Sequence, residues 1–447
     1  MKKRILYTCL ISVLSLNLFL GARLYLKSEE AAQRDEVYES METFSRVLET
    51  VRDKYVDPEK VTYKQLIDGA MKGMLGTLDP HSEYMDLAKF RAMQEDSSGQ
   101  FGGVGIQVSQ RNGVLTVIAP MDGTPGAKAG LLAQDQIVRI SGKSTEKMSL
   151  NDAVKLMRGR PDTSVKVTIR RPSTGKVFDL SIKRAIIRVT TVRDYDGKSK
   201  FPLMAGKTGY VRLSSFGDKT SGELEAALKK MEGAGMKSLI LDLRDNPGGL
   251  LDQAVLVSEK FLAKGRLVVT TRGRDKRALE QRTASGRNRH PDYPVVILVN
   301  AGSASASEIV AGCLKDHGRA VLVGVKTFGK GTVQSILPLR NGAALRLTTA
   351  KYYTPSEKVI NEVGILPDLK VDMTPQQIRD LFHKRSPGGL ENLSEEERER
   401  AKKASDLQLD DALRVVRWLE TMKPDARTKA LKAKDFQKKL KEALKDV

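Results

Sequence analysis

One stretch of the sequence, residues 300–334, most restricts how this chain can fold. It reads NAGSASASEIVAGCLKDHGRAVLVGVKTFGKGTVQ and follows an apolar run, Pro294 to Val299. The apolar run predicts a buried strand, the small residues a tight turn, and the residues from about Ser307 a helix. A strand, a small-residue turn and a helix together present a side chain at the carboxyl edge of an α/β sheet. The second apolar run, Ala320 to Val325, predicts a further strand, and it leads to Lys330 between two glycines.

The turn in this stretch has the composition of a serine nucleophile site. A hydroxyl there lies beside backbone N–H groups at a helix start, and such groups can hold an oxyanion. Lys330 is a candidate base, provided that burial leaves its amine neutral. The pattern alone does not choose among Ser303, Ser305 and Ser307. It also leaves a structural alternative open, in which the small residues only form a tight helix start and Lys330 is a solvated hairpin residue.

Histidine is the other candidate base, and a Ser-His-Asp triad requires one beside the nucleophile. The sequence contains four histidines, namely His81, His290, His317 and His383. His290 lies in a polar loop, and His317 follows Ser305 by twelve residues, toward the end of the predicted helix. His81 follows a proline at a helix end, which favours a turn residue. The sequence therefore favours a serine–lysine pair.

A second turn of the same kind lies upstream. The near-continuous apolar run from Lys237 to Leu243 predicts a strand that is covered on both faces. It leads into RDNPGG (244–249), and a helix is expected from about Leu251. Two glycines allow backbone N–H groups to approach a ligand closely. This is ordinary turn composition when taken alone. Beside the serine turn, it predicts half of an oxyanion hole.

Composition limits the other function classes. The chain has 447 residues, enough for two or three domains, and a formal net charge of +21. Its basic residues are spread out, with no aromatic-interleaved basic patch, so no nucleic-acid partner is predicted. Cys9 and Cys313 are its only cysteines, and no Cys/His cluster indicates a metal.

The N-terminus reads as an export segment. Met1 to Arg4 carries three positive charges, and Ile5 to Ala22 then runs without a charge. Leu20 is not the small residue expected before a cleavage site, and the run reaches the lower limit for spanning a bilayer. A cleaved signal peptide and a membrane anchor over residues 1–22 therefore both stay open. Either one predicts export, in a bacterium to the periplasm or the outer face of the cytoplasmic membrane.

Two further regions read as helical. Residues 29–95 form a predicted N-terminal helical region, with Val37, Met41, Phe44, Val47 and Val51 at helical spacing. Residues 373–447 form a predicted charged C-terminal helical region whose apolar stripes pack on one face, a membrane-surface role being the lesser alternative.

The region 96–187 alternates short β-like runs with turns, and it resembles a PDZ domain. The resemblance lies in FGGVGIQV (101–108), Thr124-Pro125 and AGL (129–131), and it departs at Gln134, where the family usually has glycine. A PDZ domain holds a peptide's terminal carboxylate on backbone N–H groups while the peptide adds a strand to the sheet. Here the resemblance implies N–H groups of Gly103, Val104, Gly105 and Ile106, and a side-chain pocket with Val154 and Met157. The alternative is a plain glycine hairpin in a β domain.

The order of motifs along the chain strongly resembles the carboxyl-terminal processing proteases, the S41 family of serine peptidases. The resemblance covers Glu36 to Asp372 through LDPHS (78–82), DLRDNPGG (242–249), SASASE (303–308), Lys330, Gln334 and YYTPS (352–356). The family pattern implies Ser305 as nucleophile and Lys330 as base, with Gln334, one helical turn after the lysine, orienting it. It implies oxyanion donors from the N–H of Ala306 and of Gly248 or Gly249. One departure is Glu362, where the family commonly carries glycine, and we expect it to affect only local loop structure.

The resemblance implies an α/β fold: a crotonase-like protease core over residues 188–372, an inserted β-rich PDZ domain and flanking α-helical regions. It implies peptide hydrolysis through an acyl-enzyme, without metal or organic cofactor, on protein or peptide substrates captured by their C-termini. An inactive PDZ scaffold is the rival, against which the intact Ser305, Lys330 and Gln334 set argues. A crotonase-type acyl-CoA enzyme is a weaker rival, disfavoured by export. A homo-oligomer stays open.

Overall fold

The computed structural model describes Ser15 and residues 37–444, without 112, 122, 276–278, 386–389 and 391–392. The predicted export segment, residues 1–22, thus lies outside the described residues apart from Ser15. The chain divides into two compact units, one ending at Asp86 and the other beginning at Leu87. None of the helices in the described part of the chain has the length and apolar character needed to cross a bilayer.

The first unit is helical, as its sequence spacing predicts. Residues 37–54 are helical, and they are followed by η1 (Pro58–Lys60), α2 (Tyr63–Gly76) and the short strand β1 (Glu83–Met85). Thr62 begins α2 with a capping box, in which its hydroxyl accepts from the Gln65 N–H and its own N–H donates to Gln65. The apolar stripe of residues 37–54 is mostly exposed, Val37 and Met41 at 60% and 59%.

The second unit begins with α3 (Leu87–Ser98) and the predicted PDZ region. β2 (Gln100–Gly103) pairs antiparallel with β9 (Ala185–Arg188). The main sheet has the order β3 (Ile106–Arg111), β4 (Val114–Pro120), β5 (Gln136–Ile140), β7 (Ser164–Arg171) and β8 (Lys176–Lys183), with β6 (Lys143–Ser144) beside β5. The helices are α4 (Pro125–Lys128) and α5 (Leu150–Met157). The PDZ fold class that the sequence implies is thus present as a small β domain with its own apolar core.

The protease-like core is built on a six-stranded sheet. Its order is β10 (Val192–Arg193), β11 (Thr208–Leu213), β12 (Ser238–Asp242), β15 (Val295–Val299), β16 (Val321–Gly324) and β19 (Leu369–Lys370). Only β10 pairs antiparallel; the other strands are parallel. Every residue of β12 and β15 is buried, which explains why both strands read as continuous apolar runs.

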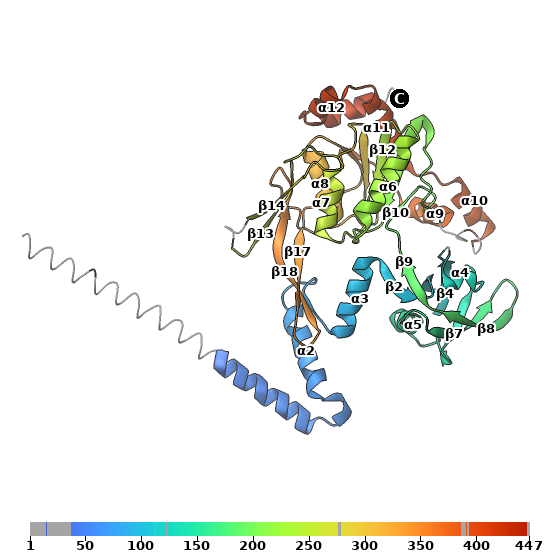
Figure 1. Ribbon diagram of the computed structural model, residues 1–447, viewed down its shortest axis with the longest axis vertical. Helices are drawn as coiled ribbons and strands as arrows, with labels where there is room; N and C mark the ends of the chain where they lie inside the picture. The colour runs from blue at the N-terminus through green and yellow to red at the C-terminus, as the bar shows by residue number, and fades with distance from the viewer. Residues whose placement is uncertain are drawn as a thin grey trace, which may run out of the picture. The chain divides into compact units, whose positions relative to one another are not determined.

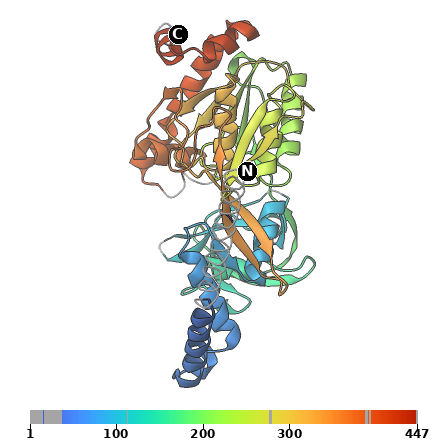
Figure 2. The same cartoon turned by 90° about the vertical axis from the view of Figure 1, so that its left-hand side faces the viewer.

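Helices cover both faces of this sheet. On one face lie α6 (Thr220–Gly233), α7 (Leu251–Glu259) and α8 (Ala306–Asp316), which pack against Leu239, Leu241 and Ile297 (Figure 1). On the other face, α11 (Leu407–Glu420) and α13 (Phe436–Ala443) pack against Ile240 and Leu298. Figure 2 shows the C-terminal helices, in red, on the side of the strands opposite α6 and α7. Within the charged C-terminal region, α11 and α13 therefore form one layer of the core.

A smaller antiparallel sheet completes the core. β13 (Leu267–Gly273) pairs with β14 (Leu279–Thr283) and with β18 (Ala344–Tyr353), and β17 (Thr332–Pro338) also pairs with β18. The β17–β18 hairpin turns at Asn341-Gly342, with Gly342 at φ 79°. The remaining elements are η2 (Ala205–Lys207), α9 (Pro375–Arg385), α10 (Glu395–Lys403) and α12 (Pro424–Leu431).

Candidate active site

Ser305 lies in the turn between β15 and α8, at the carboxyl edge of the parallel sheet. It is the residue before the first helical residue, Ala306, and its backbone has φ 54° and ψ −113°. A residue with a side chain rarely adopts this conformation, which costs on the order of 1–3 kcal/mol and persists only where the surroundings enforce it. Ser305 is 8% exposed, so only a small part of the residue is accessible to solvent.

The surroundings that enforce this turn include Glu308, whose side chain is fully buried. Its Oε2 accepts from the backbone N–H of Ser305 at 2.8 Å and from that of Lys330 at 2.9 Å. Its Oε1 accepts from the Thr327 hydroxyl at 2.6 Å and from the Gly329 N–H at 2.7 Å. One carboxylate thus joins the serine segment to the lysine segment. The sequence analysis missed this role, although a glutamate three residues after a helix-capping serine is the signature of a capping box.

Burial raises the pKa of the Glu308 carboxyl, while the hydrogen bonds from Thr327 and the three backbone N–H groups act in the opposite direction. All four partners are donors, so the geometry fits an ionised carboxylate. The desolvation effect is the larger of the two. The buried Glu308 carboxyl therefore depends on all four hydrogen-bond donors to stay in its charged form.

The second predicted turn, which follows β12, packs directly against the serine turn. A β-carbon placed on Gly248 would lie 2.8 Å from the Ser305 Cβ and 3.0 Å from the Ala306 nitrogen. Gly248 also has a φ of 101°. Only glycine satisfies both conditions without displacement of its neighbours. The structure therefore brings together Gly248, Ser305 and Ala306, as the sequence predicted.

Hydrogen bonds fasten the two turns to each other. The Asn246 carbonyl accepts from the Ala304 N–H at 3.0 Å and from the Ser307 hydroxyl at 2.9 Å. The Ser303 hydroxyl donates to the Leu243 carbonyl at 2.7 Å. Ser303 and Ser307, the two serines that the sequence pattern could not separate from Ser305, therefore serve as ties between the turns. This arrangement distinguishes Ser305 from its two neighbours.

The two candidate oxyanion glycines differ in their surroundings. The Gly248 N–H donates to the Asn246 side-chain oxygen at 2.9 Å, and Gly248 is buried. Gly249 is exposed at the surface of the turn, with φ 147°. In this conformation the Gly248 N–H is engaged within its own turn. Gly249 is the other candidate donor of the pair.

Lys330 and Gln334 follow the serine turn in the chain, but the expected helical relation between them is wrong. Lys330 precedes β17, and Gln334 lies on that strand, paired with Thr348 of β18. β-branched residues and pairing with β18 favour a strand here, so Gln334 is not one helical turn beyond the lysine. Its amide donates to the Thr332 hydroxyl at 2.6 Å.

Two of the four histidines are engaged elsewhere. His290 is buried with its ring nitrogens 2.7 Å from Glu232 and 3.1 Å from Glu225. His317 directs Nε2 to the Leu267 carbonyl at 2.7 Å, and its Nδ1 lies 2.8 Å from Arg266. Because Nε2 faces a carbonyl and Nδ1 a guanidinium, His317 is held as the neutral Nε2–H tautomer. Both rings thus serve structural contacts.

The predicted peptide groove of the PDZ region is a cavity of about 260 Å³. All six predicted residues line it, namely Gly103, Val104, Gly105, Ile106, Val154 and Met157. Phe101 and Arg158 line it as well, with the Arg158 guanidinium 4.3 Å from the centre of the Phe101 ring. The sequence analysis did not identify these two residues. The groove lies between β3 and α5, which is the geometry that a strand-adding peptide requires.

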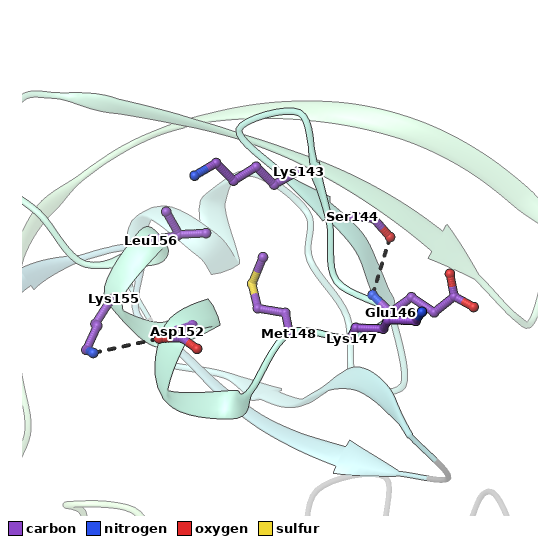
Figure 3. Close-up of a pocket in the computed structure, with 8 residues that line it drawn as sticks. All are labelled: Lys143, Ser144, Glu146, Lys147, Met148, Asp152, Lys155 and Leu156. Atoms are coloured by element: carbon purple, nitrogen blue, oxygen red, sulfur yellow. Dashed lines mark hydrogen bonds and ion pairs between the residues drawn. The ribbon is translucent and has the colours of Figure 1, made fainter. Parts of the chain in front are cut away.

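A larger hollow of about 640 Å³ also borders α5 (Figure 3). Its lining includes three lysines, Lys143, Lys147 and Lys155, together with Met148. Asp152 pairs with Lys155 across one turn of the helix, as Figure 3 shows. The lining contains no serine–lysine constellation with buried support. The size of this hollow therefore does not indicate a reaction site.

Comparisons with known proteins find similar domains and sequences. The family model "Peptidase family S41" matches residues 207–371, the PDZ domain model matches 116–171, and "Activating protease CtpB N-terminal domain" matches 20–88. A carboxy-terminal-processing protease of Bartonella bacilliformis is 43% identical, over 79% of this chain and 80% of the relative. The carboxy-terminal processing protease CtpA of Bacillus subtilis is 36% identical, over 80% of this chain and 74% of the relative. A solved photosystem II D1 C-terminal processing protease is 29% identical and covers 74% of this chain and 92% of its own, with a TM-score of 0.43.

Proposed function

The chain belongs to peptidase family S41, the carboxy-terminal-processing serine proteases, and on that premise we propose that Ser305 is the nucleophile and Lys330 the general base. Gln334 orients the base from its strand. The backbone N–H groups of Ala306 and of the glycine turn form the oxyanion hole, with Gly249 as the donor from that turn.

One observation carries this assignment. A single oxygen of the buried Glu308 accepts from the backbone N–H of both Ser305 and Lys330, at 2.8 and 2.9 Å. Residues twenty-five positions apart are thereby fixed to one atom. A nucleophile and its base require this kind of shared, rigid support, because small displacements of reacting groups cost large factors in rate.

The reaction follows from these groups. Neutral Lys330 accepts the Ser305 proton as the serine oxygen attacks the substrate carbonyl carbon. The tetrahedral oxyanion then lies against backbone N–H groups at the start of α8, where the first N–H groups of a helix lack partners within it. The Lys330 ammonium returns a proton to the leaving amine, which leaves an acyl-enzyme on Ser305. Water then hydrolyses the ester, again with Lys330 as base.

The PDZ groove selects substrates by their C-termini in this proposal. The N–H groups of residues 103–106 hold the terminal carboxylate, and the last side chain enters the apolar part of the cavity beside Val154 and Met157. An apolar C-terminal residue is preferred. The full chain carrying Ser305→Ala binds peptides without cleaving them, so matched free-acid and amidated peptides can be titrated. Equal affinity for the two would exclude C-terminus recognition.

Export and self-association are part of the same proposal. Residues 1–22 direct the chain across the cytoplasmic membrane, as a signal peptide or as an anchor. The exposed apolar side chains of the first unit, such as Val37, Met41 and Met74, fit contact with a second copy or with a membrane surface. Light scattering of the purified chain, with and without Met41→Glu, distinguishes self-association from membrane contact, because only self-association changes the mass.

The catalytic assignment is tested with an unfolded protein substrate. Ser305→Ala and Lys330→Ala are each expected to lower the rate by about 10⁴-fold or more, since groups that act as a unit fail together. Lys326→Ala, an exposed lysine four residues earlier, is the matched control and keeps wild-type activity. The rate also increases with pH as the Lys330 amine loses its proton. Retained activity in Lys330→Ala, with loss in His317→Ala, would reject the lysine base.

A further inference from the structure

The glycine turn that follows β12 begins with a buried arginine. Arg244 is 6% exposed, and its guanidinium lies between two carboxylates. Its Nε and Nη2 donate to Asp242 at 2.6–3.1 Å. Its Nη1 and Nη2 donate to the two oxygens of Asp406, each at 2.8 Å. A bidentate ion pair of this kind fixes the plane of the guanidinium as well as its location.

Asp406 is held in place without help from Arg244. It caps α11, accepting from the Leu409 N–H at 3.2 Å, and it also accepts from Arg385 at 2.8 Å. α11 packs on the strands of the main sheet, including β12, which leads into the turn (Figure 1). The carboxylate is therefore a fixed point of the C-terminal layer, 162 residues along the chain from Arg244.

The turn that Arg244 begins is the one that contacts the serine turn. Two residues later, the Asn246 carbonyl accepts from Ala304 and Ser307, and Gly248 lies against Ser305. The Arg244 backbone is tied to its own side-chain partner, because its N–H donates to Asp242 at 2.9 Å. A displacement of the guanidinium is thus passed to the backbone that carries the glycines.

We propose that Asp406 is a positioning residue for the peptidase reaction. Through Arg244 it fixes the glycine turn against Ser305, so the charged C-terminal helical region is required to form the oxyanion hole. This inference rests on the proposed role of that turn as an oxyanion donor. It assigns a catalytic purpose to a region whose helices otherwise only cover the sheet.

The charge balance of the cluster gives the physical reason. Arg244 and Arg385 face Asp242 and Asp406, two cations against two anions, with the Tyr210 hydroxyl donating to Asp242 at 2.6 Å. Removal of the Asp406 carboxylate leaves the guanidinium groups of Arg244 and Arg385 with Asp242 as the one remaining carboxylate of the cluster, and an uncompensated positive charge is strongly unfavourable in the interior. Arg244 then moves toward water, and its turn moves with it. A misplacement of about 1 Å at a catalytic group costs on the order of 100-fold in rate.

The test compares Asp406→Asn with Asp380→Asn in the full chain. Asp380 is the matched control: it belongs to the same C-terminal region, is buried at 6% exposed, and pairs with Arg400 at 2.9 Å. It accepts from Arg400 and Gln376, both outside the glycine turn, so its loss weakens the region without touching that turn. The kcat and KM of both variants are measured on one peptide substrate, at a temperature below the melting transition of either variant.

Asp406→Asn is expected to lower kcat by about 10-fold to 100-fold with KM within about twofold of wild type, whereas Asp380→Asn keeps kcat. Asp406→Glu, which restores the carboxylate, is expected to recover part of kcat. Equal losses of kcat in the two asparagine variants, in proportion to lost stability, overturn the proposal, as does a change confined to KM.

If Asp406→Asn does not fold, Arg244→Lys carries the test, because a lysine cannot bridge both carboxylates. Ser305→Ala is measured in parallel: its retained activity would reject the proposed function, whereas an active Asp406→Asn beside an inactive Ser305→Ala rejects only this inference.

Discussion

The serine turn and the glycine turn are built by the same local device and are held in different ways. Both follow a buried parallel strand, β15 or β12, and both lead into a helix on the same face of the sheet. The serine turn is held from within, by Glu308 of the helix that it starts. The glycine turn is held from a distance, through Arg244, by Asp406 of the C-terminal layer.

This difference separates two requirements of the reaction. In the proposed mechanism, the nucleophile and base need a fixed mutual distance, and the Glu308 carboxylate supports it through four short hydrogen bonds. The oxyanion turn needs a fixed distance to the nucleophile, and its anchor belongs to another region of the chain. The core could keep its nucleophile in place while losing the oxyanion donor.

Gly248→Ala breaks the contact between the turns and should have the largest effect. The new methyl group would lie 2.8 Å from the Ser305 Cβ and from the Ala304 carbonyl, so one turn must move. We expect kcat to fall by about 10³-fold, near the loss of a whole oxyanion donor. Gly222→Ala is the control, since Gly222 lies in α6 with nothing within 4 Å of the added carbon. Steady-state kinetics on one peptide check the pair, and an active Gly248→Ala would contradict the close packing.

Glu308→Gln tests the internal support of the serine turn. A glutamine offers one oxygen and one NH₂ group, so two of the four donors would face another donor. We expect kcat to fall by about 100-fold through displacement of Ser305 or Lys330, because both depend on one oxygen. The rate of labelling by a fluorophosphonate, which reports the nucleophile alone, should fall as well. Unchanged labelling with lost peptidase activity would place the role of Glu308 elsewhere.

The sequence predicted most of the fold because its signals are local. Near-continuous apolar runs predicted β12 and β15, and the small-residue turns after them predicted the starts of α7 and α8 to within a residue or two. It could not predict the Arg244–Asp406 pair, because nothing local relates residues 162 positions apart. The relation of Lys330 to Gln334 failed for a different reason. A spacing of four fits a helix, but pairing with β18 decides in favour of a strand.

The structure also explains the two positions at which the sequence departs from family patterns. Gln134 and Glu362 stand where glycine is usual, and both have a positive φ, 71° and 63°. The backbone shape that favours glycine is thus retained without it. Glu362 also lies nearer the site than its sequence position suggests, since its N–H donates to the Gly329 carbonyl at 2.7 Å. Its loop therefore contacts the segment that carries Lys330.

The two turns should also respond to pH with opposite signs. Burial alone would raise the pKa of Asp242, but the Arg244 guanidinium lowers it to about 2, from 3.8. Its stabilising contribution is present above about pH 3.8 and is lost as the pH falls toward 2. Burial raises the pKa of Glu308 above 4.5, so its contribution is present below pH 4.5 and is lost as the pH rises through the raised value.

Urea unfolding across pH 2.5–7 checks this contrast. The stability difference between wild type and Asp242→Asn should shrink on acidification, whereas that between wild type and Glu308→Gln should shrink as the pH rises. Arg212, Arg385 and Asp406 also face the Asp242 cluster, so the protein is compared with its own variant at each pH. If both stability differences changed in the same direction with pH, the opposite pH dependences assigned to Asp242 and Glu308 would be wrong.

The smallest expected effect lies in the backbone of the glycine turn. Asp245 has φ 56°, the counterpart of Ser305 at φ 54° in the other turn. A non-glycine residue with positive φ costs about 1 kcal/mol, and Asp245 offsets part of this because its side chain accepts from Asn300 at 2.8 Å. Asp245→Ala loses the hydrogen bond and keeps the strain, whereas Asp245→Gly loses both. We therefore expect the glycine variant to be more stable than the alanine variant by about 0.5–1 kcal/mol in urea unfolding, with kcat within about twofold of wild type in both. If alanine is the more stable of the two, the strain is not in this turn, and the serine turn alone carries the unfavourable backbone.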